Sequence, residues 1–103
     1  MNLILSNQFC EEYKNKKEIL HKGDIVIYKD IDTKRWENYI VIGKVVYTSA
    51  IKSDKVRILA IKSFGNDNLN MISDYGYVIT KKMIMYKIID FELFLENNSE
   101  HFI

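Results

Sequence analysis

The sequence predicts an α+β protein that is mainly β, built as a small antiparallel and partly open barrel of about five strands. The clearest observation is the stretch NYIVIGKVVYT at residues 38–48, in which β-branched and aromatic side chains dominate. A second is the series of short apolar runs, separated by turn-forming residues, between residues 24 and 90. The third is the length of 103 residues, which is enough for one domain. We therefore expect a single domain over 1–103.

The strands are expected to follow one another through tight connections. Strands of this length separated by turns favour antiparallel pairing over βαβ units, and an SH3-like barrel at 24–90 is the expected arrangement. The expected strands are residues 24–29, 38–48, 55–63, 74–80 and 83–89. The first contains four consecutive apolar residues, IVIY, which predicts burial on both sides. In the second, Gly43 predicts a sharp bend that lets one long strand serve both faces.

Helical segments are expected at both ends of the chain. Apolar residues at near-helical spacing predict a helix over residues 7–19, within a helical N-terminal element at 1–20. Asp90 is placed to cap a short helix at 91–97, FELFLEN. Residues 98–103 are expected to form a frayed tail.

Composition narrows the class of protein. Cys10 is the single cysteine, so neither an internal disulfide nor a cysteine-based zinc site is expected, and we expect no metal and no cofactor. Cys10 itself fits a small apolar position on the N-terminal helix. The chain has no run near the roughly 18 apolar residues of a membrane span and no secretory signal pattern at its start. We therefore expect a cytoplasmic protein without membrane contact.

The net charge of +1 conceals an uneven distribution. Residues 21–87 carry twelve basic and seven acidic residues, whereas residues 88–103 carry four acidic residues and no basic one. A mildly basic middle permits contact with nucleic acid without requiring it.

The most distinctive candidate site is the polar loop TKRWE at residues 33–37. Arginine can pair with phosphate or carboxylate through two hydrogen bonds, and tryptophan can stack on a base or fill a partner's pocket. Basic and aromatic residues also interleave elsewhere, in pairs such as Tyr28/Lys29. Alternatively, Trp36 folds onto the barrel mouth and the tyrosines simply pack at its rim. The candidate binding residues are Lys34, Arg35, Trp36, Tyr39, Lys62, Phe64, Tyr75 and Tyr77.

The sequence also resembles a known family over about residues 22–64. The order GDIV at 23–26, a loop with Arg35, the strand YIVIG and the strand ILAIKS ending at Ser63 is similar to PemK/MazF-type mRNA interferases. That resemblance implies an SH3-like barrel that cleaves single-stranded RNA. It implies that Arg35 stabilises charge on the phosphate while the hydroxyl of Ser63 positions or donates.

Three functions remain open on the sequence alone. The first is a non-catalytic binding module, of the kind found among phage and other mobile-element accessory proteins. It would bind a protein or single-stranded nucleic acid of a host nucleic-acid-processing system, for example as an inhibitor. The second is an endoribonuclease toxin of the PemK/MazF type. The third is a structural subunit that assembles into a homo-oligomer through an edge strand. We favour binding over catalysis, because the sequence contains Tyr, Trp and Arg residues but no convincing acid–base pair.

Overall fold

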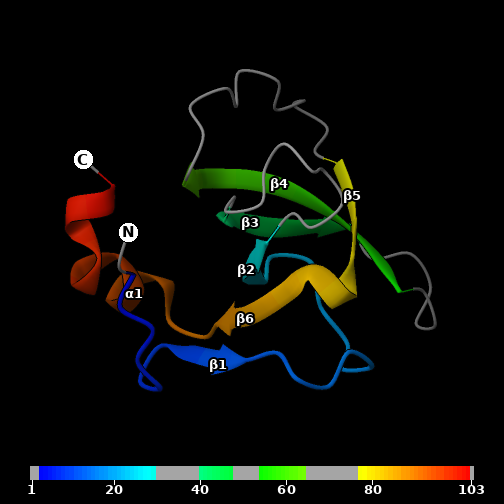
Figure 1. Cartoon of the computed structure of the whole chain (residues 1–103), viewed down its shortest axis with the longest axis horizontal. Helices are drawn as coiled ribbons and strands as arrows, with labels where there is room; N and C mark the ends of the chain where they lie inside the picture. The colour runs from blue at the N-terminus through cyan, green and yellow to red at the C-terminus, as the bar shows by residue number, and fades with distance from the viewer. Residues whose placement is uncertain (1–2, 30–39, 48–53, 65–76, 103) are drawn as a thin grey trace.

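The structure of the chain is a computed structural model that describes residues 3–29, 40–47, 54–64 and 77–102. Within these residues, six antiparallel strands form one sheet in the order β1-β6-β2-β3-β4-β5, with one α-helix near the C-terminus (Figure 1). The elements are β1 (Cys10–Glu12), β2 (Ile25–Lys29), β3 (Ile40–Tyr47), β4 (Lys55–Phe64), β5 (Tyr77–Thr80), the 3-10 turn η1 (Lys81–Met83), β6 (Ile84–Ile88), α1 (Phe91–Asn97) and the 3-10 turn η2 (Ser99–His101). The α+β, mainly β class is confirmed.

All five predicted strands are present, and a sixth was not predicted. β2, β3, β4, β5 and β6 fall within or nearly within the expected ranges, although residues 74–76 lie outside the described part of the chain. Each of these strands pairs with the next in the chain from β2 to β5, and β6 returns to pair with β2. β1 extends the sheet beyond β6. The order is that of an open sheet with β1 and β5 at its edges.

Each face of the sheet carries its own hydrophobic cluster, and β2 and β3 contribute to both. Val26 and Tyr28 of β2 join one cluster, whereas Ile27 joins the other. β3 alternates in the same way, with Val41 on the first side and Ile42 on the second. All five side chains are at most 1% exposed. The predicted two-sided burial of both strands is therefore confirmed, and β3 lies in the interior of the sheet, between β2 and β4.

Gly43 lies at the point where β3 and β4 change register. Ile42 is opposite Lys62, but Gly43 is opposite Ala60, so that β4 has one extra residue, Ile61, at this position. A Cβ atom on Gly43 would collide with Cγ2 of Ile58 and would lie 3.3 Å from Cε1 of Tyr28. A bulge with a glycine opposite it allows local bending and close approach of the strands. The register shift lies at Gly43, the residue at which the sequence predicted a sharp bend.

The predicted N-terminal helix is wrong. Within residues 7–19 the structure has the strand β1 and irregular turns, and Cys10 lies on that strand rather than on a helix. The buried residues were identified correctly, but they serve different clusters: Phe9 packs in one and Tyr13 in the other. Because β6 supplies pairing partners, Tyr13 N donates to Met85 O at 2.9 Å and Ile89 N donates to Phe9 O at 2.9 Å. Strand pairing therefore overrides the helical spacing.

The C-terminal helix is confirmed, but the frayed tail is not. α1 spans Phe91–Asn97, and the side chain of Asp90 caps it by accepting a hydrogen bond from Leu93 N at 3.1 Å. The following residues form η2. The ring of Phe102 packs edge-on against the ring of Phe94, with 6.1 Å between the two ring centroids. The helix, η2 and the N-terminal segment gather beside one end of the sheet (Figure 1). This region is ordered because its aromatic side chains complete the second hydrophobic cluster.

Candidate binding surface

One end of the sheet brings together the two connections that carry most of the predicted site. Lys29 at the end of β2 is opposite Ile40 at the start of β3, and Ile40 is opposite Phe64 at the end of β4. The chain therefore leaves the sheet after Lys29, returns to it at Ile40 and leaves it again after Phe64, at three neighbouring positions. Neighbouring strands are about 4.8 Å apart, so residues distant in sequence begin side by side here.

Most of the predicted site residues lie outside the described part of the chain. These are Lys34, Arg35, Trp36, Tyr39 and Tyr75. The structure describes only the backbone of Ser63, Phe64 and Tyr77, at the end of β4 and the start of β5. Lys62 is fully described and partly exposed, opposite Ile42.

A second surface, of which the sequence analysis named only Lys62, lies on β3, β4 and β5. Cross-strand partners share a face of the sheet, and here the pairs are Lys44 with Leu59, Arg57 with Val78, and Lys55 with Thr80. Lys62 is on the same side, because its partner Ile42 belongs to the cluster that α1 covers. We call Lys44, Lys55, Arg57, Lys62, Leu59 and Val78 the basic face.

The basic face is the part of this side of the sheet that the hydrophobic clusters leave uncovered. Leu59 and Val78 belong to neither cluster, and Val78 is 52% exposed. By contrast, Ile27 and Ile42, farther along the same side, pack with Phe94 of α1. The sequence signal for this surface is the alternation KVRI at residues 55–58, but only the pairing of strands shows that Lys44 lies beside it.

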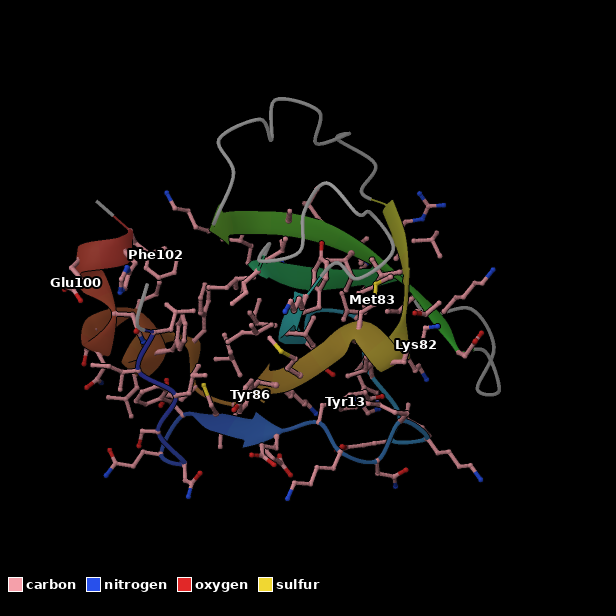
Figure 2. The ribbon with its side chains drawn as sticks, viewed as in Figure 1. Tyr13, Lys82, Met83, Tyr86, Glu100 and Phe102 are labelled. Atoms are coloured by element: carbon pink, nitrogen blue, oxygen red, sulfur yellow. The ribbon has the colours of Figure 1, made fainter. Side chains whose placement is uncertain are left out.

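The described charges separate between the two ends of the molecule. From β3 through η1 the described residues include six basic side chains and one acidic one, Asp54. In the rest of the described chain eight acidic residues accompany six basic ones. Figure 2 shows the two extremes, with Lys82 of η1 at one end of the long axis and Glu100 of η2 at the other. The described residues from β3 through η1 therefore carry an excess of positive charge, whereas the rest of the described chain carries a small excess of negative charge.

A hollow of about 600 Å³ is lined by residues of β1 and its neighbours. β1 lies on the opposite side of the molecule from β4 (Figure 1). The hollow is lined in part by Leu5, Cys10, Glu12, Tyr86 and Ile89. Cys10 is 3% exposed, and its burial raises the pKa of the thiol to about 11. A thiol that stays protonated at neutral pH is a poor nucleophile and a poor metal ligand, so Cys10 has a packing role.

The remaining polar clusters also have structural roles. Asp24 accepts a hydrogen bond from the backbone N of His21 at 2.8 Å and lies 3.6 Å from Lys87 Nζ, which ties the turn before β2 to β6. The side chain of His21 is 75% exposed, as expected for a solvated loop residue. Tyr28, an aromatic member of the interleaved pairs, is fully buried and cannot stack on a ligand. Among the described residues, no group of three or more His, Cys, Asp or Glu side chains could hold a metal ion.

Comparison with protein-family models, with curated proteins and with solved structures finds no match to this chain. Within the described ranges, none of the helices has the length and apolar character needed to cross a membrane.

Proposed function

We propose that the chain is a small binding module built on an SH3-like barrel, and that it binds a component of a nucleic-acid-processing system. Support for the barrel comes from chain connectivity. Strands β6, β2, β3, β4 and β5 are consecutive neighbours in the sheet, and the three residues of η1 join β5 directly to β6. The chain thus links the two ends of this five-stranded set, and β5 passes from the level of β4 to that of β6 (Figure 1). Met83 of η1 packs in the cluster that this curvature encloses (Figure 2).

The observation that carries the proposed function is the alignment of Lys29, Ile40 and Phe64 across β2, β3 and β4. It places the starts of the two predicted binding connections next to each other on a rigid scaffold, as binding loops require. Two candidate segments that are far apart in sequence can then contact one partner. Arg35 and Trp36 are the residues we expect to contribute most, since such side chains dominate binding hot spots.

Affinity purification with mass spectrometry tests this function directly. Tagged protein is incubated with host lysate, with and without nuclease, and a partner is expected to be recovered at stoichiometric yield. The Arg35→Ala/Trp36→Ala variant should lose that partner while keeping the wild-type melting temperature. Retention of the partner by this variant would show that the loops are not the binding site.

A second candidate function, RNA cleavage, is favoured by the position of Ser63. Ser63 is opposite Val41 near the start of β3, so its backbone lies at the sheet end from which the connection containing Arg35 enters β3. This is the neighbourhood that a phosphate-binding arginine and a hydroxyl would need. Purified protein in large excess over labelled single-stranded RNA is the test. Cleavage that disappears in both Arg35→Ala and Ser63→Ala supports the nuclease, and intact RNA removes it.

A further inference from the structure

We propose that the basic face binds the sugar-phosphate backbone of a single-stranded nucleic acid. The proposal rests on the proposed function, and it adds the class of partner and the surface that holds it. The surface is distinct from the loops at residues 30–39 and 65–76, since its residues lie within β3, β4 and β5.

Charge is the first argument. The basic face combines Lys44, Lys55, Arg57 and Lys62, and among the described residues no acidic side chain shares it. Lys44 and Lys55 are exposed, and Arg57 and Lys62 are partly exposed. Four cations on one sheet face form a surface that attracts a polyanion and resists contact with other basic surfaces.

The spacing of the cations is the second argument. Alternate residues on a strand, such as Lys55 and Arg57, are about 6.6 Å apart, and they point to the same side of the sheet. Lys44 comes from the neighbouring strand, opposite Leu59. From Lys55 to Lys62 the face extends for about 20 Å along β4, given about 3.3 Å per residue. This length spans several nucleotides of an extended strand.

The apolar members of the face favour a single strand over a duplex. Leu59 lies between cations on β4, and Val78 is opposite Arg57 and 52% exposed. A duplex presents mainly phosphates to such a surface, whereas a single strand also offers the faces of unstacked bases, which have apolar character. An acidic protein would also match the charges, so the salt dependence of binding is the property that distinguishes the two partners.

Fluorescence anisotropy with a labelled oligouridine tests the proposal. The double variant Lys44→Gln/Lys55→Gln removes two exposed cations from the face. If both contact phosphates, the slope of log affinity against log salt should fall in magnitude by about 1.4, since each contact contributes about 0.7 for a single strand. The matched control is Lys14→Gln/Lys17→Gln, which removes two exposed lysines from the segment that follows β1 and should leave the affinity within twofold of wild type.

Each other outcome counts against the proposal. An equal loss of affinity for oligouridine in the two double variants would show that binding depends on net charge and not on the basic face. Equal affinity for a duplex of the same length would overturn the preference for single strands. If the oligouridine does not bind but a stoichiometric protein is recovered from lysate through Arg35 and Trp36, the basic face is not a nucleic-acid site and the binding module stands. Circular-dichroism melting curves show that the variants are folded.

Discussion

The side chain of Asn98 pairs with the backbone of Ile4 as a neighbouring strand would. Its Oδ1 accepts a hydrogen bond from Ile4 N at 2.7 Å, and its Nδ2 donates to Ile4 O at 3.1 Å. Nδ2 also donates to Phe94 O at 2.9 Å, and Asn98 is 1% exposed. One buried amide therefore holds the N-terminal segment against the end of α1.

Replacing Asn98 with Asp should destabilise the protein by about 1–3 kcal/mol, because the carbonyl oxygens of Ile4 and Phe94 would lose their donor and face a buried carboxylate. Urea unfolding at neutral pH measures the change. Asn97→Asp is the matched control, since Asn97 is exposed and makes one hydrogen bond, to Leu93 O. A loss at Asn98 no larger than at Asn97 would contradict the role assigned to this amide.

Gly43→Ala should also destabilise the fold, by about 1–3 kcal/mol, because the new methyl group overlaps Cγ2 of the fully buried Ile58. The free energy of unfolding gives the cost, and the Gly43→Ala/Ile58→Ala double variant shows its origin. If the overlap is the cause, the two costs are less than additive. Strict additivity would locate the effect elsewhere.

The buried thiol of Cys10 predicts a decline of stability in alkaline solution. Its pKa is about 11 in the folded protein against 9.0 when solvated. Because the folded pKa is the higher one, the unfolded chain loses its proton first, and stability falls as pH rises from about 9 to about 11. The two-unit difference corresponds to at most about 2.7 kcal/mol. Cys10→Ala should show a flatter profile over this window than the wild type, and parallel profiles would contradict the assignment.

Removing the cap of α1 should loosen the packing on one face of the sheet. Asp90→Ala deletes the acceptor for Leu93 N and should cost about 1 kcal/mol, whereas Asp90→Asn or Asp90→Ser should retain most of the stability. Thermal unfolding compares the three variants. Equal losses in all three would mean that the negative charge, rather than the hydrogen bond, matters.

The features that could be predicted from the sequence are those that depend on the local pattern of residues. Alternating and continuous apolar runs located β2, β3 and β4, and Asp90 marked the start of α1. The N-terminal helix failed because Phe9 and Tyr13 are buried in different clusters, which local spacing cannot distinguish from one helix face. Likewise, the sequence placed Asn98 in a frayed tail, because its partner Ile4 lies 94 residues away along the chain.

The candidate surfaces also differ in whether local sequence or the pairing of distant segments defines them. Arg35 and Trp36 stood out as unusual residues in a polar loop, and the neighbouring strand ends are consistent with that interpretation. Apart from Lys62, the residues of the basic face were missed because the face depends on register: Lys44 joins Arg57 and Lys55 only through the β3–β4 pairing, which includes two register shifts. Non-local pairing of this kind is not encoded in any single segment.

The most direct measurement of the central claim is an NMR titration of isotope-labelled protein with unlabelled oligouridine. We expect the largest amide shift changes at Lys44, Lys55, Arg57 and Val78, with smaller changes at β1 and α1, and we expect them to diminish as salt is raised. Two results would contradict the account. One is shift changes confined to β1 and α1, and the other is no shift change at oligouridine concentrations that saturate a basic control protein.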